Sequence, residues 1–244
     1  MDVQFLGSGD AFGSGGRFNT CIHVAVAGGA FLIDCGASSL IAMRKFGIDP
    51  NRIHTIFVSH LHGDHFGGLP FLLLDAQFYS RRNNPLTLVG PPGLQDRLTL
   101  AMEIFFPGSS KIERKFALSI YEIGAGESLA INGVMVTAFR VEHACGAPPF
   151  ALRLSCEGKV LAYTGDTEWT DSLLDAGRDA DLLIAEALFF ERKVKHHLDY
   201  ATLKANLGRI GAERVILTHM GPDMLARLAQ VQDEVAEDGK AVRV

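Results

Sequence analysis

Long apolar runs and a secretion signal are both missing from this sequence of 244 residues. The longest apolar run, 69–74, is far shorter than the roughly 20 residues that a membrane-spanning helix needs. The first four residues, from Met1 to Gln4, open neither a basic segment nor an apolar one, so nothing marks the chain for export. We therefore expect a cytoplasmic protein that does not associate with membranes.

Cysteine is scarce, and its spacing carries no metal or redox signature. The four cysteines form no CxxC pair, and a chain of this size in which 48% of the residues are hydrophobic does not depend on disulfides for a stable core. The sequence therefore predicts buried, reduced thiols at Cys21, Cys35, Cys145 and Cys156.

An excess of positive charge is also missing. The 23 lysines and arginines are outnumbered by 28 aspartates and glutamates, which gives a net charge of −5. Acidic and basic residues are interleaved along the whole chain, whereas a general nucleic-acid-binding protein usually carries a strongly basic face. The charge disfavours general nucleic-acid binding, although it leaves room for a small basic pocket.

No linker, repeat or low-complexity tract divides the chain. The 26 glycines are spread along its whole length and do not gather into a linker. We expect a single domain that spans residues 1–244.

Apolar periodicity and turn residues predict a layered α/β fold, with strands and helices in both halves of the chain. Asp199 is expected to cap the helix that follows it, and Gly47 to end the first helix. Helices are expected at 38–46, 67–78, 93–105, 200–210 and 224–237. Strands are expected at 3–6, 21–26, 30–34, 53–58, 86–89, 134–141, 151–155, 160–164, 182–185, 215–218 and 241–244.

The segment that carries chemistry is His60-Leu61-His62-Gly63-Asp64-His65, directly after a predicted strand. Residues two apart in an extended chain point to the same side, so His60 and His62 can converge on one metal ion. We expect Gly63 to turn the backbone sharply and to bring Asp64 and His65 toward a second ion. Imidazole and carboxylate ligands without thiolate suit zinc, manganese or iron. A solvated histidine-rich loop is the alternative.

These residues match the HxHxDH motif of the metallo-β-lactamase superfamily, and the resemblance covers most of the chain. It implies a four-layer αββα sandwich and a hydrolase with two divalent transition-metal ions, of which zinc is favoured over manganese and iron. Four further segments resemble family motifs in the correct order, each after a predicted strand: Asp34-Cys35-Gly36, His143, Thr164-Gly165-Asp166 and Thr218-His219.

The resemblance also implies which residues hold the ions. Asp34 would not be a ligand, but would orient the loop that carries the ligands. The implied ligands are His60, His62 and His143 for one ion, Asp64, His65 and His219 for the other, and Asp166 between the two, with Asp64 also counted among the catalytic residues.

Two further residues resemble the ribonuclease Z branch of the superfamily. His197 matches its extra histidine, which contacts the scissile phosphate, and it would protonate the leaving oxygen or neutralise phosphoryl charge. Glu186 matches a glutamate near that histidine and would hold His197 protonated. The alternatives are a surface histidine pair, His196 and His197, before a helix, and a strand-end carboxylate that pairs with Arg192 or Lys193.

The chain departs from the branch in one important respect. Ribonuclease Z enzymes carry a protruding tRNA-binding arm between the third histidine and the bridging aspartate, and here only 23 positions separate His143 from Asp166. Residues 7–10 and 17–20 resemble the N-terminal loop of the branch, but tight-turn chemistry explains them equally well. We therefore regard tRNA as a disfavoured partner.

The sequence predicts a phosphodiesterase that acts on a small or exposed anionic phosphodiester, such as a cyclic nucleotide, a cyclic phosphate or an oligonucleotide end. A lactonase or thioesterase of the same fold is the alternative, with His197 incidental. A non-catalytic, metal-stabilised binding protein is a third hypothesis that the complete ligand set disfavours. A homodimer is compatible with all three.

Overall fold

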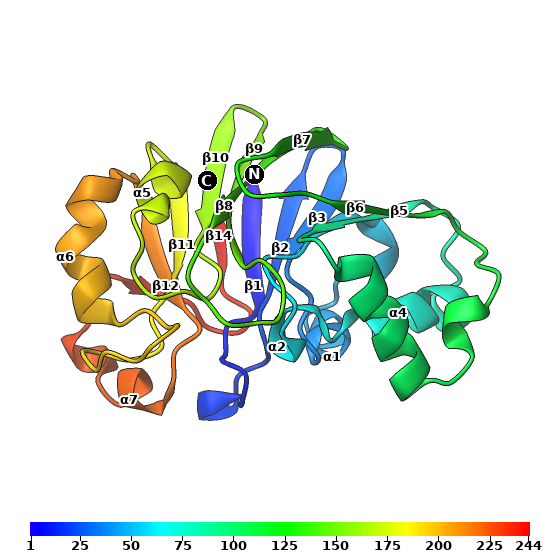
Figure 1. The fold of residues 1–244 in the computed structure, drawn as a ribbon, viewed down its shortest axis with the longest axis horizontal. Coiled ribbons are helices and arrows are strands. Elements are labelled where there is room, and N and C mark those ends of the chain that lie inside the picture. Colours follow the sequence, from blue (N-terminus) through cyan, green and yellow to red (C-terminus); the bar gives the residue numbers. More distant parts are fainter.

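The computed structural model describes residues 1–244 and contains two mixed β-sheets of seven strands each. The sheets pack face to face in the middle of the molecule, and helices cover both outer faces (Figure 1). This arrangement is the expected four-layer αββα sandwich of the metallo-β-lactamase fold.

The first sheet is built mainly from the N-terminal half of the chain. Its strands β3 to β6 run parallel to one another, whereas β2 pairs antiparallel with both β1 and β3, and β1 pairs antiparallel with β14. Its order is β14 (Ala241–Arg243), β1 (Asp2–Gly7), β2 (Cys21–Val26), β3 (Gly29–Ile33), β4 (Ile53–Phe57), β5 (Leu86–Gly90) and β6 (Leu118–Glu122). The helices on this half are α1 (Ser39–Lys45), α2 (Gly63–Phe66), α3 (Leu69–Leu74), the π-helix η3 (Asp75–Tyr79) and α4 (Leu94–Phe105), with short 3₁₀ turns η1 (Ser14–Gly16), η2 (Pro50–Arg52) and η4 (Ser109–Lys111).

The second sheet is built from the C-terminal half. Strands β7 to β10 are antiparallel, and β10 to β13 are parallel. Its order is β13 (Glu234–Val235), β12 (Val215–Thr218), β11 (Leu182–Glu186), β10 (Lys159–Tyr163), β9 (Phe150–Cys156), β8 (Val134–Arg140) and β7 (Ser128–Ile131). The helices on this half are α5 (Ser172–Gly177), α6 (Tyr200–Ile210), α7 (Pro222–Leu225) and the 3₁₀ turn η5 (Leu228–Gln230).

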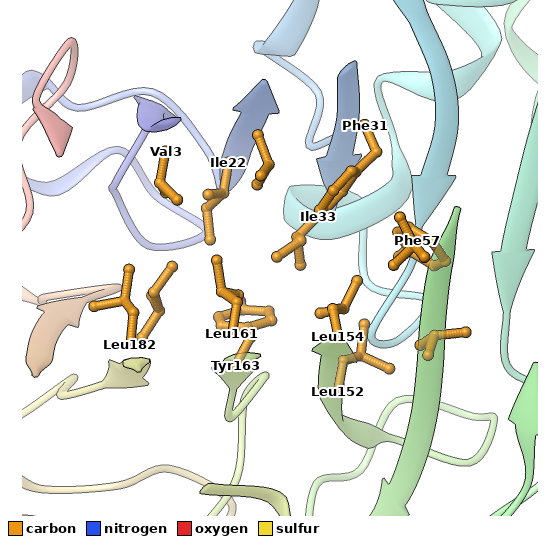
Figure 2. Close-up of a cluster of buried hydrophobic side chains, with 14 of the residues drawn as sticks. Val3, Ile22, Phe31, Ile33, Phe57, Leu152, Leu154, Leu161, Tyr163 and Leu182 are labelled. Atoms are coloured by element: carbon orange, nitrogen blue, oxygen red, sulfur yellow. The ribbon is translucent and has the colours of Figure 1, made fainter. Parts of the chain in front are cut away.

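Alternation along the strands creates the layers, because successive side chains of a strand point to opposite faces of its sheet. In β4, Phe57 packs between the sheets and Ile56 packs under the helices of the first half. In β11, Ile184 packs between the sheets and Leu183 under the helices of the second half. Figure 2 shows the apolar layer where the two sheets meet. Each large side chain buried there stabilises the fold by roughly 1.5–3 kcal/mol.

Most predicted elements are present within one or two residues of their expected bounds. Asp199 caps α6, where its side chain accepts from the backbone N–H of Thr202 at 2.8 Å, and Gly47 follows α1 with a φ of 69°. All four cysteines are buried and unpaired. The helix predicted at 67–78 begins at Leu69 as α3, continues as η3 to Tyr79, and is preceded by the short helix α2.

The helix expected at 224–237 is wrong. The segment contains only the last residues of α7 and the turn η5, and it then enters strand β13. β13 pairs parallel with β12, where Leu217 and Val235 are in register. Asp233 also accepts hydrogen bonds from the Tyr200 hydroxyl and the Lys204 ammonium, which hold the extended segment beside α6. These long-range contacts outweigh the helical propensity of the segment.

The two ends of the chain lie in the same sheet, because β14 pairs with β1. This pairing supports the single domain over residues 1–244, which stays a prediction. No helix in the structure combines the length and the apolar character that crossing a membrane requires.

Candidate metal centre

Polar side chains gather at one rim of the sandwich, at the carboxyl ends of several strands. His60 follows β4 in the first sheet. In the second sheet, His143 follows β8 and Asp166 follows β10. Glu186 ends β11, and His219 follows β12. Ligands of open α/β sheets bind outside such strand ends, because the loops there leave the regular hydrogen-bond pattern.

The first cluster contains three histidines. The donor atoms of His60, His62 and His143 all lie within 4.8 Å of one another, and His143 Nε2 is 3.0 Å from His62 Nδ1. His60 is fully buried, and its Nδ1 lies 3.1 Å from the hydroxyl of Ser59. That contact leaves His60 Nε2 free to face the cluster, as it must if His60 and His62 are to bind the same ion.

The second cluster combines carboxylates with histidines. Asp64 Oδ2 lies 3.1 Å from His65 Nε2 and 3.1 Å from His219 Nε2. Asp166 adds its Oδ1 at 3.3 Å from His65 Nε2 and its Oδ2 at 3.5 Å from His219 Nε2. All four residues are buried, so their charges have few partners besides one another.

Asp166 lies between the two clusters. Its Oδ2 is also 3.8 Å from His60 Nε2 and 3.9 Å from His143 Nε2, which belong to the first cluster. Burial opposes a charge on Asp166, but His219 and His65 hold the pKa of its carboxyl well below the usual range. The carboxylate is therefore ionised and available to both clusters.

The donor atoms fit divalent transition metals. Zinc binds imidazole and carboxylate at about 2.0–2.2 Å, and a tetrahedral site then separates its ligand atoms by roughly 3.3–3.6 Å, close to the separations within the clusters. His60 Nε2, His65 Nε2 and Asp166 Oδ1 are buried and have no hydrogen-bond partner. Unpartnered buried polar atoms are costly, and a cation would satisfy all three. The His/Asp cluster thus constitutes a divalent metal site, while the assignment of individual ligands stays a prediction.

Asp34 supports the loop that carries the predicted ligands. It lies at the end of β3 with a φ of 59°, an uncommon conformation for a residue other than glycine. Its Oδ2 accepts from His65 Nδ1 at 2.7 Å and from the Ser59 hydroxyl at 2.8 Å, and its Oδ1 accepts from the Ser59 N–H at 2.8 Å. These bonds direct His65 Nε2 toward the cluster, as a residue that supports a ligand does in a metal site.

The expected role of Gly63 is wrong. Gly63 is the first residue of α2 and has no positive φ, and a side chain there would meet nothing within 4 Å. The start of α2, directly after its N-cap His62, turns the chain instead through ordinary helical geometry. The glycine that the loop does need is Gly36, where an added Cβ would lie 2.1 Å from the carbonyl oxygen of Asp64.

One supporting group was missed by sequence reasoning. The ring of His143 donates from Nδ1 to the backbone carbonyl of His196 at 2.8 Å, which leaves its Nε2 for the cluster. His196 has a φ of 71°, and its N–H donates to Glu168 Oε2 at 3.1 Å. A backbone carbonyl carries no residue-specific signal, so the sequence could not have identified it.

His197 and Glu186 form a pair beside the clusters. His197 Nδ1 makes a short hydrogen bond to Oε1 of the fully buried Glu186, whose Oε2 accepts from the Thr167 N–H at 2.8 Å. Burial disfavours a charged His197, but the hydrogen bond and charge of Glu186 outweigh it and raise the pKa of the imidazole. The pairing of Glu186 is thus with His197, and not with Arg192 or Lys193.

A cavity of about 310 Å³ opens onto these groups. It is lined by His62, Asp64, Asp166, His197 and His219 together with Asp10, Phe12 and Phe189. A second hollow of about 480 Å³, beside β3 and β4 near His54, has none of the His/Asp clusters and is not the site. Sequence reasoning missed Phe12 and Phe189. The signal for Phe12 was an aromatic residue within a loop of glycine, serine and aspartate, and no comparable signal marks Phe189.

The segment between His143 and Asp166 contains no additional element. It consists of β9, a turn at Glu157-Gly158 and β10, and this hairpin is part of the second sheet. No arm protrudes at this point of the chain.

The sequence matches a known family over almost its whole length. Residues 1–237 match the family model of the Anti-Pycsar protein Apyc1. Ribonuclease Z of Methanothermobacter thermautotrophicus is 31% identical, over 90% of this chain and 86% of that protein. Ribonuclease Z of Geobacillus kaustophilus is 27% identical, over 90% of this chain and 88% of that protein.

The fold is similar to that of solved structures of the same superfamily. Human tRNase Z, short form (ELAC1), superposes with a TM-score of 0.82 at 27% identity, over 100% of this chain and 99% of that chain. A diphosphatase from the PhnP family superposes with a TM-score of 0.79 at 18% identity, over 100% and 97% of the two chains, which supports the fold alone. Together with the His/Asp cluster, these similarities identify a metal-dependent phosphodiester hydrolase of ribonuclease Z-like character. The chain belongs to the Anti-Pycsar protein Apyc1 family.

Proposed function

We propose that this protein is a phosphodiesterase that acts on a small or exposed phosphodiester, namely a cyclic nucleotide, a cyclic phosphate or an oligonucleotide end. The observation that carries the proposal is the His197–Glu186 pair, whose histidine lines the same cavity as the metal centre. In the alternative, a lactonase or thioesterase of the same fold, His197 would be incidental.

The proposed ligands are the seven residues that the sequence predicts. Asp166 would contact both ions, because its oxygens lie near His60 and His143 on one side and near His65 and His219 on the other. Two bound divalent ions supply Lewis-acid stabilisation of a phosphoryl group and lower the pKa of the water that attacks it. Zinc is our first choice of metal, because the donors are imidazole and carboxylate.

The role proposed for His197 is that of a proton donor to the leaving oxygen. Glu186 accepts from Nδ1, so the other ring nitrogen, Nε2, is left for the substrate. The anionic Glu186 favours the protonated imidazole, and a proton on Nε2 can move to the departing oxygen as its bond to phosphorus breaks. The side chain of His197 is 24% exposed, which suits a group that must meet a substrate.

The size of the cavity favours a small substrate. A volume of about 310 Å³ is at the lower end of the range for small-molecule sites. The chain also lacks residues that its longer relatives have: its alignment with ribonuclease Z of Agathobacter rectalis extends over 304 positions, about 60 more than the 244 residues of this chain. A tRNA-binding arm would need such an insertion.

RNA is the competing substrate class, because the curated relatives are named ribonuclease Z or ribonuclease BN. The expectation that tRNA is disfavoured therefore stays a prediction. It is supported by the net charge of −5 and by the plain hairpin between β9 and β10.

A substrate panel tests the proposal. Protein of measured metal content would be assayed against bis-p-nitrophenyl phosphate, purine and pyrimidine cyclic nucleotides, a precursor tRNA, a lactone and a thioester. We expect the cyclic nucleotides to give the highest kcat/KM. A higher kcat/KM for the lactone or thioester would overturn the phosphodiesterase, and a higher value for the precursor tRNA would overturn the small substrate.

A further inference from the structure

The loop 8–16 carries one large apolar side chain that does not contribute to the packing of the core. Phe12 lies near the tip of this loop and is 94% exposed. Leaving a phenylalanine in water forgoes roughly 1.5–3 kcal/mol of burial energy. Among the exposed aromatic residues, Phe12 is the one that lines the cavity of the metal centre.

Hydrogen bonds within the loop fix the backbone around Phe12, although the ring of Phe12 is exposed to solvent. Asp10 accepts hydrogen bonds from the backbone N–H of Phe12 at 3.2 Å, from the Ser14 N–H at 2.8 Å and from the Ser14 hydroxyl at 2.6 Å. Gly13 has a φ of 67°, which lets the chain reverse directly after Phe12.

The base of the loop is anchored to the C-terminal segment. Asp238 accepts from the N–H groups of Ser8 and Phe18 at 2.9 and 2.8 Å. Arg17 donates to the Ala236 carbonyl at 2.6 Å. A preorganised ring of this kind loses little entropy when it binds a ligand.

A second aromatic residue lines the same cavity. Phe189 belongs to the loop after β11, and its carbonyl accepts from the Tyr200 N–H at 2.8 Å. The guanidinium of Arg192 lies 5.4 Å from the centre of the Phe189 ring. The cavity thus combines a metal centre for the phosphate with two phenylalanine rings and a nearby cation.

We infer that Phe12, with Phe189 beside it, stacks on the nucleobase adjacent to the scissile phosphodiester. Stacking on an aromatic side chain tolerates any base, because every base has a π-face. Apart from the metal centre and His197, the only polar side chain in the lining is that of Asp10, which provides no complete pattern for reading one base. The inference rests on the proposed phosphodiesterase activity, and the same contact would serve a cyclic nucleotide or the terminal base of an oligonucleotide.

Base-containing and base-free substrates test the inference. The kcat/KM would be measured for a purine and a pyrimidine 3′,5′-cyclic nucleotide, for a dinucleoside monophosphate, and for the 3′,5′-cyclic phosphate of methyl ribofuranoside, which has no base. In Phe12→Ala, we expect the ratio of kcat/KM for either cyclic nucleotide to that for the base-free substrate to fall about 5- to 30-fold, mainly through KM.

Two variants serve as controls. Phe12→Trp keeps an aromatic face and should retain the ratio of the wild type. Phe78→Ala removes an exposed phenylalanine from η3, outside the cavity, and should leave the ratio unchanged. If the ratio falls only for the dinucleoside monophosphate, Phe12 stacks on the base of an oligonucleotide end and not on that of a cyclic nucleotide. An unchanged ratio for all substrates in Phe12→Ala would overturn the inference.

Binding provides a readout that does not depend on turnover. Isothermal titration calorimetry would compare a nucleoside 5′-monophosphate with ribose 5-phosphate, and we expect the nucleotide to bind more tightly to the wild type but not to Phe12→Ala. Equal binding of the two by the wild type would contradict stacking. If the nucleotide binds through Phe12 but no phosphodiester is hydrolysed, the proposed function fails and the inference stands. If phosphodiesters are hydrolysed with an unchanged ratio, the inference fails and the proposed function stands.

Discussion

Replacement of His197 by alanine separates the phosphodiesterase from other hydrolases of the same fold. The imidazole is held at Nδ1 by a buried carboxylate and lines the cavity, which are the conditions for a positioned acid. Removal of such a group costs roughly 10²–10⁴ in rate. We therefore expect kcat of His197→Ala to fall by that factor for phosphodiesters with alkoxide leaving groups.

The loss should not come from unfolding. In His197→Ala, Oε1 of Glu186 loses its partner, while Oε2 still accepts from the Thr167 N–H at 2.8 Å. Leaving a buried carboxylate without its cationic partner costs roughly 3–5 kcal/mol, which is no more than the low end of the ~5–15 kcal/mol that stabilises a typical domain. Circular dichroism should show a folded protein, and metal content should match the wild type, because His197 is not a proposed ligand.

The leaving group distinguishes two roles for His197. Nitrophenolate departs without protonation, so the effect of His197→Ala should shrink for nitrophenyl esters if the residue acts as a general acid. A uniform loss across leaving groups would indicate stabilisation of phosphoryl charge alone. His54→Ala, at the opposite end of β4 from His60 and outside the site cavity, is the matched control and should keep wild-type activity. If His197→Ala hydrolyses every phosphodiester as fast as the wild type, the reasoning is refuted and the lactonase or thioesterase becomes the better hypothesis.

Three further predictions concern the metal centre. Elemental analysis should find about two transition-metal ions per chain, and a content below one without recovery of activity on adding metal would contradict the two-metal site. His62→Ala and Asp64→Ala should abolish hydrolysis while circular dichroism stays that of a folded protein, because the apolar core lies between the sheets and away from the ligand loop; wild-type turnover in both would refute the assignment. Asp34→Asn should weaken metal affinity by about 10- to 100-fold, the usual cost of losing a group that orients a ligand, and unchanged affinity in a competition titration would show that the Asp34–His65 bond is dispensable.

Much of the fold could be read from the sequence because its signals are local. Strand β11 is buried at every position, so its residues 182–185 stand out as a short apolar run. The helix expected at 224–237 failed because the pairing of β13 with β12 is a long-range contact that leaves no local pattern.

The sequence by itself determined which residues stand at strand ends, and thereby the candidates for the metal centre. Only the tertiary structure decided which of them meet, because β4 and the strands of the second sheet converge at one rim through packing between distant segments. It paired Glu186 with His197 in preference to nearby cations, since both side chains point into the same buried space. It also brought Phe12, from the N-terminal loop, to the cavity beside His219. Such contacts depend on the packing of whole sheets, and no periodicity or spacing within the chain encodes them.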